Sequence, residues 1–546
     1  MMPWRERLDP SPHRRIPTPP EHADMSLGPI RFLMARLPVA FAVAWLALVA
    51  GAGCGRRPAV VQGEVPGIGI LDGWDAAFYL DGSRAGTVHT TVERSSQPPE
   101  LYKTRVFMDL RVKRYGQVVP MRMEQTTVED AAGKMVRMEI VQYLDQGNQR
   151  ATGVVDGDSI IIKSQGTAGE RRVPLPSLAI GPWRQSQILR EQAGKTGATW
   201  KMDTFELSLQ VPTVLNGRVI GPEKTDVLIE RDGKLAPEPK ELVRCEITCD
   251  PVKIGGQATP LPALDQWLEG GEVVRSRVDM PGLGPITMYR VPEEAARKAD
   301  ASGAALPDLG SQTLVFLDKP VADIHNKAEV VYGFTLPGDS SPATSFTIDW
   351  RQSAGQAKGE AFDLKVTSET LTPSPKPGAN ALAPNFFLDS SDKAVAALAA
   401  GPAGNQPWEV AKALERLVHD RMSTTSGIGF ATAGQVAREL KGDCRQHAML
   451  LATLCRARQI PARTALGLVY IIDRASGKPA LGFHMWTEVY CDGGWRGLDA
   501  TMGEGKIGPG HVKVADTTWS EAPSLAPLLP VLRVMGRLKA TVVSFR

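Results

Sequence analysis

Residues 441–463, KGDCRQHAMLLATLCRARQIPAR, place a cysteine directly after Gly442 and Asp443 and at the head of an apolar run. Aspartate is a favourable N-cap residue, so a helix is expected to begin at Cys444. In the first turn of such a helix, unpaired backbone N–H groups and the positive end of the helix dipole favour the thiolate, the nucleophilic form of cysteine. The face expected to pack against the rest of the domain comprises Ala448, Leu451 and Cys455.

Two residues further along the chain decide whether Cys444 is catalytic or only buried. His484 opens the segment HMWTEVY, the residues CDGG predict a turn, and WRGLDAT leads back to Asp499. In such a hairpin, His484 and Asp499 lie within a direct or diagonal step across adjacent strands. A carboxylate holds a neighbouring imidazole in one tautomer, and that imidazole can take a proton from a thiol and later give it to a leaving amine. Alone, each residue would more often be structural, but together they predict a catalytic triad.

The combined motifs resemble the transglutaminase-like superfamily, whose members share a papain-like fold with a Cys-His-Asp site. The matching segments are GDCRQHA, LCRARQIPAR, GLVY, HMWTEVY and LDAT, and they fall within residues 390–515. The resemblance implies that Cys444 is the nucleophile, His484 the general acid and base, and Asp499 its orienting partner. No cofactor and no metal are expected. Gln459 departs from the family, which usually has glycine before IPAR. Because glycine suits a left-handed helix end, a strained turn is expected at Gln459.

Other polar and aromatic residues near these motifs are expected to be structural. His447 lies one turn after Cys444 and is interpreted as a spare polar group. His511 could line the cleft, but a surface loop is favoured. Trp486 and Trp495 are expected to pack around the hairpin, and Arg463 to make structural hydrogen bonds.

Length, charge and motif content limit which other classes of function the chain could have. The chain has 546 residues and a net charge of +3, which is too small an imbalance to indicate a nucleic-acid partner. It carries no C-x-x-C, H-E-x-x-H, P-loop or G-x-G-x-x-G motif, so the sequence gives no support for metal or nucleotide binding. If Cys245 and Cys249 share a strand, their Cα atoms are about 13 Å apart, too far for a disulfide.

The predicted fold class is multidomain, with a β-rich N-terminal region followed by an α+β transglutaminase-like (papain-like) core. Turn-punctuated alternation of apolar and polar residues predicts the first part, which PSLAIGPWRQSQILREQ interrupts as a helix. Helical periodicity followed by strands predicts the second. The expected boundaries are 1–53 leader and signal peptide, 54–72 linker, 73–300 β-rich domain, 301–384 small β-unit and proline-rich linker, and 385–546 transglutaminase-like domain.

The N-terminal segment indicates export. Residues 37–53 are apolar and free of charge, basic residues precede them, and Cys54 follows. GAGC resembles a bacterial lipobox, in which the cysteine is lipidated, although Gly51 stands where leucine is usual. An uncleaved anchor helix or ordinary secretion are the alternatives. Translation could begin at Met25 or Met34 instead of Met1, because the segment before Met25 has no signal-peptide character.

The sequence therefore predicts a thiol enzyme of the bacterial cell envelope, lipid-anchored to a membrane and facing the periplasm or the exterior. It is expected to act on amide bonds of proteins or peptides through an acyl-enzyme, as a protease, an amidase or a transglutaminase. The expected partners are the protein or peptide substrate and the membrane, with no nucleic acid. The alternative is an envelope binding or scaffold protein that uses the same fold without catalysis.

The lipid anchor can be tested by metabolic labelling with a palmitate analogue. The wild-type protein is expected to incorporate the label, whereas Cys54→Ser is expected not to, because the thiol that carries the lipid is gone. Label that persists in Cys54→Ser would show that the chain has no lipid at this position.

Overall fold

A computed structural model describes residues 67–546 with short gaps, so the predicted signal peptide and Cys54 lie outside the described residues. The gaps are residues 81, 115–116, 145–146, 166–169, 255–256, 281–283, 299–305, 307, 309–312, 369–370, 403, 426–430 and 521–528. In the part of the chain that is described, no helix is both long and apolar enough to cross a membrane.

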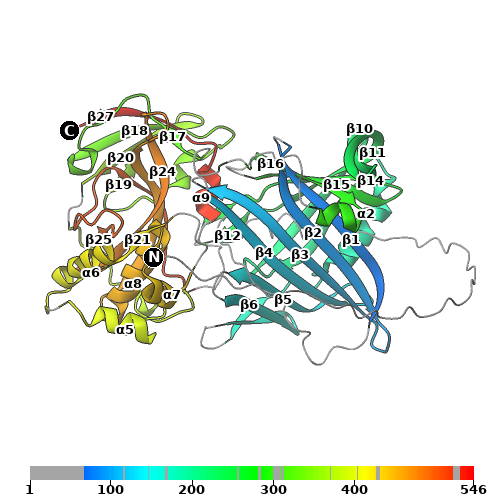
Figure 1. The fold of residues 1–546 in the computed structure, drawn as a ribbon, viewed down its shortest axis with the longest axis horizontal. Coiled ribbons are helices and arrows are strands. Elements are labelled where there is room, and N and C mark those ends of the chain that lie inside the picture. The colour runs from blue at the N-terminus through cyan, green and yellow to red at the C-terminus, as the bar shows by residue number, and fades with distance from the viewer. Residues whose placement is uncertain are drawn as a thin grey trace, which may run out of the picture. The chain divides into compact units, whose positions relative to one another are not determined.

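The N-terminal region is β-rich, as predicted, and forms one large antiparallel sheet of 14 strands (Figure 1). The sheet order is β8-β7-β6-β5-β4-β3-β2-β1-β16-β15-β14-β11-β10-β9. The strands are β1 (Gly67–Tyr79), β2 (Arg84–Ser95), β3 (Leu101–Arg114), β4 (Gln117–Asp130), β5 (Met135–Leu144), β6 (Gly147–Asp156), β7 (Ser159–Ser164), β8 (Arg171–Pro174), β9 (Thr199–Glu206), β10 (Val211–Arg231), β11 (Lys234–Cys249), β14 (Leu264–Glu269), β15 (Glu272–Met280) and β16 (Gly284–Val291). Strand β1 begins at Gly67, inside the segment expected to be a linker.

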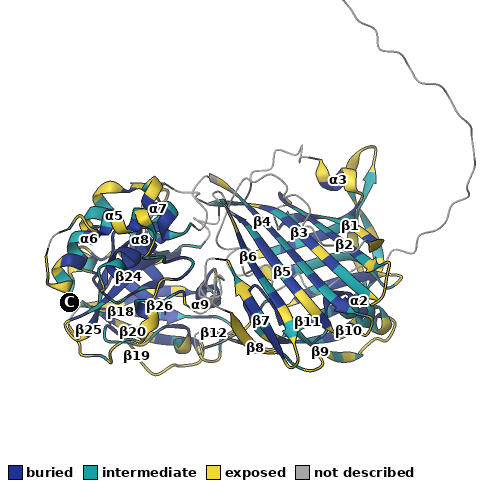
Figure 2. Ribbon diagram, turned by 90° about the horizontal axis from the view of Figure 1, so that it is seen from below, coloured by how far each residue is buried: buried dark blue, intermediate teal, exposed yellow. Residues whose placement is uncertain are grey.

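Alternation of residue types gives this sheet two different faces. Along β3, the core-facing side chains are Val106, Met108, Leu110 and Val112, all buried. The side chains between them include charged residues that are half-buried or exposed. Successive side chains of a strand point to opposite faces, so the pattern places the apolar face inward, and Figure 2 shows the resulting alternation of buried and more exposed positions along these strands.

Shorter elements complete the N-terminal region. The predicted helical interruption is present as α2 (Pro182–Ala193), with proline at its start, where the missing N–H costs nothing. The other short elements are α3 (Glu293–Arg297) and the paired strands β12 (Val252–Ile254) and β13 (Gln257–Thr259).

The C-terminal region contains helices that precede most of a second sheet. Its helices are α5 (Lys393–Ala399), α6 (Pro407–Arg421), α7 (Ala433–Glu439), α8 (Cys444–Ala457) and α9 (Leu529–Val534), with short 3-10 turns η2 (Ile324–Asn326), η3 (Pro342–Ser345) and η4 (Ala379–Ala381). Its strands are β17 (Val315–Phe316), β18 (Glu329–Thr335), β19 (Gln352–Ala354), β20 (Ala361–Thr367), β21 (Ser423–Thr424), β22 (Lys441–Gly442), β23 (Ala462–Ile472), β24 (Pro479–Cys491), β25 (Gly494–Leu498), β26 (His511–Thr517) and β27 (Lys539–Phe545).

Strand pairing joins segments that the sequence suggested were separate units. One sheet has the order β17-β24-β23-β26, with β25 on β24, and another has the order β19-β20-β18-β27. Strands β17 and β18 come from the expected small β-unit, whereas their partners β24 and β27 come from the expected transglutaminase-like domain. The small unit therefore shares both of its sheets with the C-terminal segment, because pairing between distant segments leaves no local signal in the sequence.

Helix α8 begins at Cys444, as predicted. The Asp443 side chain accepts the backbone N–H of Arg445 at 2.9 Å, and the Gln446 side chain accepts the backbone N–H of Asp443 at 3.0 Å. This reciprocal capping fixes the first turn of α8. The preceding helix α7 ends at Glu439, because Leu440 takes the left-handed conformation and β22 then pairs with β21.

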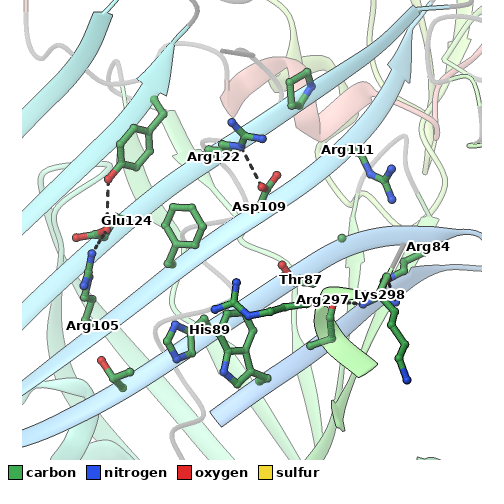
Figure 3. A pocket seen from close by; sticks show the side chains of 17 residues that line it. Arg84, Thr87, His89, Arg105, Asp109, Arg111, Arg122, Glu124, Arg297 and Lys298 are labelled. Atoms are coloured by element: carbon green, nitrogen blue, oxygen red, sulfur yellow. Dashed lines mark hydrogen bonds and ion pairs between the residues drawn. The ribbon is translucent and has the colours of Figure 1, made fainter. Parts of the chain in front are cut away.

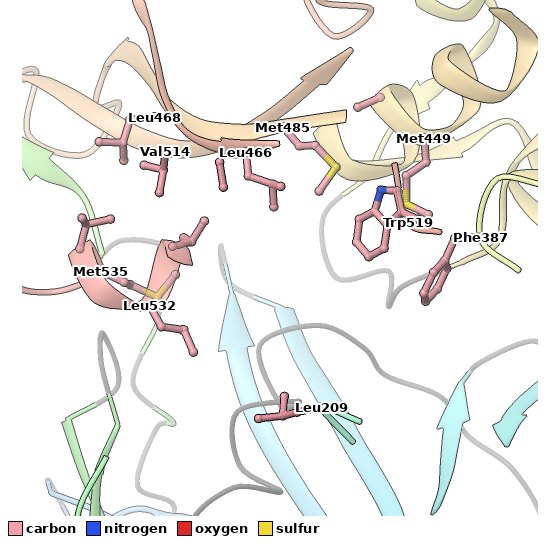
Figure 4. Close-up of a cluster of buried hydrophobic side chains, with 14 of the residues drawn as sticks. Leu209, Phe387, Met449, Leu466, Leu468, Met485, Val514, Trp519, Leu532 and Met535 are labelled. Carbon is pink, nitrogen blue, oxygen red and sulfur yellow. The ribbon is translucent and has the colours of Figure 1, made fainter. Parts of the chain in front are cut away.

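The core of the C-terminal region lies between α8 and its sheet (Figure 4). Figure 4 shows side chains from α8, β23, β24 and β26, among them Met449, Leu466, Met485 and Val514, all buried. The Thr487 hydroxyl donates to the Ala448 carbonyl at 2.9 Å, which ties β24 directly to α8. These contacts fix the position of Cys444 relative to the strand that carries His484.

The turn after α8 has the strain that the sequence predicted. Gln459 has a φ of 60°, in the left-handed region, and its side chain is exposed. A non-glycine residue in this conformation costs roughly 1–2 kcal/mol. The Ile460 N–H donates to the Cys455 carbonyl at 2.9 Å and closes the helix end, so the turn keeps its form without glycine.

Candidate active site

The hairpin of β24 and β25 brings His484 to Asp499, as the sequence predicted. Asp492 and Gly493 form its two-residue turn with φ values of 54° and 84°, the left-handed pair that matches the twist of the strands. Asp499 follows the last residue of β25, and its Oδ2 lies 2.7 Å from Nε2 of His484. The Asp499 side chain is 1% exposed and that of His484 is 8% exposed, so the pair is shielded from water.

Cys444 completes the arrangement from the opposite element, the first turn of α8. Its thiol is a hydrogen-bonding and electrostatic partner of His484, and the residue is partly exposed. Because Nε2 of His484 contacts Asp499, Nδ1 is the ring nitrogen left for the thiol. The structure thus brings all three predicted residues together, two from one hairpin and one from a helix N-terminus.

The charges of the site stabilise one another. Burial lowers the pKa of His484, but the Asp499 carboxylate and the Cys444 thiol outweigh it, so this pKa stands well above 6.5. Burial likewise raises the pKa of Asp499, but its contacts with His484 and His511 bring it well below 3.8. The contribution of His484 to the stability of the fold is fully present below the pKa that its imidazole has in the unfolded chain. It is lost as pH rises through the higher pKa of the folded state. The contribution of Asp499 is fully present above the pKa that its carboxyl group has in the unfolded chain, and it is lost as pH falls through the lower pKa of the folded state.

His511 was predicted to lie in a surface loop, and this is wrong. It is the first residue of β26, its side chain is 1% exposed, and its Nε2 lies 3.0 Å from Oδ2 of Asp499. Asp499 therefore contacts a second histidine, which lies outside the sequence motifs of the predicted triad. The available signal was the alternation of Val512 and Val514 with polar residues, which indicates a strand.

The remaining predicted residues have structural contacts. His447 is buried and its Nδ1 lies 2.8 Å from the Asp443 carbonyl, which confirms it as a polar group of the helix start. Trp486 and Trp495 are buried in the hairpin. Arg463 pairs with Glu488 at 2.8 Å and with Asp516 at 2.9 Å. Cys245 and Cys249 are both free thiols, as their spacing along β11 requires.

His484, Asp499 and His511 also place one potential ligand atom each within 4.8 Å of one another. Both histidines contact the same carboxylate oxygen at hydrogen-bonding distance. Hydrogen bonding therefore explains this spacing without a metal ion.

Comparison with known proteins gives one match to a protein family. Residues 394–500 match the model of the transglutaminase-like superfamily, a range that includes all three predicted residues. The chain therefore contains a transglutaminase-like domain. No curated protein is similar enough to be matched to the chain.

Solved structures show only distant similarity. A candidate cysteine protease from Cytophaga hutchinsonii is 18% identical over 40% of this chain and 86% of its own, with a TM-score of 0.24. A β-barrel-like protein of a domain of unknown function from Brucella abortus is 16% identical over 40% of this chain and 96% of its own, with a TM-score of 0.30. The periplasmic domain of TgpA from Pseudomonas aeruginosa is 15% identical over 58% of this chain and 94% of its own, with a TM-score of 0.22. TM-scores this low do not establish a shared overall fold.

The thiols should differ in reactivity toward iodoacetamide at pH 6. Cys444 is expected to be labelled far faster than Cys455 or Cys491, because both of these are buried and burial raises the pKa of Cys455. Because the Asp499 carboxylate holds the pKa of His484 well above 6.5, the imidazole is a cation at pH 6 and favours the thiolate beside it, so labelling of Cys444 is expected to be fast at this pH. Mass spectrometry of peptides after timed alkylation measures the rates. Equal, slow labelling of the three cysteines would contradict an activated thiol.

Proposed function

We propose that the transglutaminase-like domain catalyses thiol-dependent acyl transfer on amide bonds of proteins or peptides. The observation that carries the proposal is the shared geometry of Cys444, His484 and Asp499, with the thiol and the carboxylate on the two nitrogens of one imidazole. This order of groups is what nucleophilic catalysis by a thiol requires.

The reaction follows from these positions. The sulfur of Cys444 attacks the amide carbon and forms a C–S bond, while the thiol proton is held on His484. His484 then gives that proton to the departing nitrogen as the C–N bond breaks, which leaves a thioester. Water or an amine next attacks the thioester carbon, loses a proton to His484, and releases the acyl group as an acid or as a new amide. The thiolate leaves and the site returns to its starting state.

The helix start supplies a donor for the oxyanion that forms during attack. In α8 the side chain of Asp443 accepts the N–H groups of Arg445 and Gln446. Among the described residues, no acceptor pairs with the backbone N–H of Cys444. We assign this N–H to the oxyanion, because it lies beside the attacking sulfur at the positive end of the helix dipole.

The domain is proposed to have the papain-like α+β arrangement, in which the helix carries the nucleophile and the sheet carries its partners. We favour protease or amidase activity over transamidation. The whole protein is proposed to work in the bacterial envelope, anchored through Cys54. Only the residue pattern of the N-terminal segment supports this location.

Turnover of labelled peptides, with and without an added amine, tests this function. Cys444→Ala should abolish turnover, and His484→Ala should be nearly as severe, because no proton carrier remains. Asp499→Asn should cost less, since the thiol and imidazole survive, and should add nothing to Cys444→Ala. Mass spectrometry of the products distinguishes hydrolysis from transfer.

Circular dichroism serves as the control that each variant is folded. Cys444→Ala that keeps more than about a tenth of the wild-type rate would place the chemistry elsewhere, because a tenfold loss is only about 1.4 kcal/mol of barrier. A wild type with no turnover and a slow thiol would favour the scaffold alternative.

A second function is favoured for the β-rich region, which has a cavity of about 820 Å³ on the polar face of β2–β5 (Figure 3). Its lining includes two carboxylates, both paired: Asp109 with Arg122 at 3.0 Å and Glu124 with Arg105 at 2.7 Å. Figure 3 shows Arg111 apart from these pairs, and no described residue provides it with a carboxylate. The cations of the lining are Arg84, Arg105, Arg111, Arg122, Arg297 and Lys298. We propose that this cavity binds acidic peptide segments.

A fluorescent oligoglutamate peptide tests this binding in the full chain. Arg111→Gln should weaken the affinity about fivefold, the effect of one charge-assisted contact. Arg172→Gln, which removes an exposed cation outside the cavity, is the matched control and should bind as the wild type does. Equal affinity of Arg111→Gln and the wild type, or no binding by the wild type, would contradict the proposal.

A further inference from the structure

One carboxylate oxygen of the site has two imidazole partners. Oδ2 of Asp499 lies 2.7 Å from Nε2 of His484 and 3.0 Å from Nε2 of His511. A carboxylate oxygen has two lone pairs, so it can accept both N–H groups at once. Nothing in the Cys-His-Asp chemistry itself requires the second donor, so its presence needs its own explanation.

The partners of His511 fix its tautomer. Since Asp499 can only accept, Nε2 of His511 carries the hydrogen, and Nδ1 is unprotonated in the neutral ring. Nδ1 is buried without a hydrogen-bond partner among the described residues. The neighbouring ring is that of His325, edge-on with centroids 5.2 Å apart. His325 supplies no negative charge that would favour a second proton on His511.

Burial keeps His511 neutral where the enzyme would work. It lowers the pKa of His511 to about 4, although the contact with Asp499 opposes this. A neutral ring donates a hydrogen bond to Asp499 without adding a positive charge beside His484. A second cation there would compete for the carboxylate and lower the pKa of His484, whereas a neutral donor leaves that ion pair intact.

The backbone around His511 is held firmly. The Arg351 guanidinium donates to the carbonyls of Gly508 and His511 at 2.8 and 3.1 Å. A Cβ at Gly508, in the segment just before β26, would lie 1.8 Å from the backbone oxygen of His325, so these two stretches of backbone pass too closely for a side chain at this position. The imidazole is thus placed by its strand and not only by its contact with Asp499.

We propose that His511 is a positioning residue, a neutral N–H donor that keeps Asp499 ionised and aligned toward His484. The inference rests on the proposed thiol chemistry and deepens it. His511 does not contact the reacting atoms and acts through Asp499. The titratable groups that interact electrostatically with His511 or Asp499 are His484, His325, His447 and Glu415. One step further away, Cys444 interacts with His484 and Glu504 with His325.

The test is the pH profile of Cys444 alkylation in the full chain. His511→Leu keeps the volume but removes the donor, whereas His511→Gln can place an N–H near the position of Nε2. Without the donor the pKa of Asp499 rises, so the acid limb of the profile should move to higher pH. The midpoint of the acid limb should lie about one pH unit higher in His511→Leu than in the wild type, so on that limb His511→Leu should react about tenfold more slowly, whereas His511→Gln should stay within about threefold.

A purely structural role would not produce that pattern. An unchanged acid limb in folded His511→Leu, or a loss that His511→Gln does not restore, would overturn the proposal. If His511→Leu does not fold, ¹⁵N NMR of the wild type with labelled histidine rings tests the proposal by reporting the charge and the tautomer of His511. It should show His511 neutral with hydrogen on Nε2 at pH 6, and either a charged ring or the opposite tautomer would overturn the proposal.

These outcomes separate the inference from the proposed function. Slow alkylation of Cys444 in the wild type at pH 6 would reject the activated thiol itself, and the role of His511 in it. Fast alkylation in the wild type together with an unchanged His511→Leu profile would reject only the role of His511.

Discussion

A single buried carboxylate governs the candidate site. Asp499 is 1% exposed, and an ionised group in such surroundings is stable only when donors and opposite charge surround it. His484 supplies the charge and a hydrogen bond, and His511 supplies a second hydrogen bond. The Thr501 N–H donates to the other oxygen at 2.9 Å. The ionised Asp499 then holds His484 in the state that partners Cys444, so the proposed chemistry of the thiol depends on how many hydrogen bonds this carboxylate accepts.

The sheet that supports Asp499 is itself pinned by buried charge. Lys513 is 1% exposed and its Nζ lies 2.9 Å from Glu488 and 2.8 Å from Asp516. Arg463 contacts the same two carboxylates. This network joins β23, β24 and β26, and truncating any one member would leave uncompensated charge in the interior, which is strongly destabilising. It therefore fixes the register of β26 and with it the position of His511.

Close backbone packing adds a second constraint on the same strands. A Cβ at Gly467 of β23 would lie 2.0 Å from the carbonyl oxygen of Val512 and 2.9 Å from the Trp486 ring. Only glycine allows β26 and the buried Trp486 to approach β23 this closely. The candidate site is thus built on closely packed strands and a capped helix, the kind of support that the proposed reaction needs to place its groups precisely.

The sequence by itself determined the local parts of this protein. Asp443 as a cap fixed the start of α8, the turn at Asp492 and Gly493 fixed the hairpin, and both signals depend only on near neighbours in the chain. They sufficed to bring His484 to Asp499 and to predict strain at Gln459. Only the tertiary structure decided that His511 is buried against Asp499, and that β27 completes the sheet of β18. The pairing of β18 with β27 joins residues far apart in the chain, and the contact of His511 with Asp499 depends on the register of neighbouring strands. The local residue pattern does not encode which strand will be the neighbour.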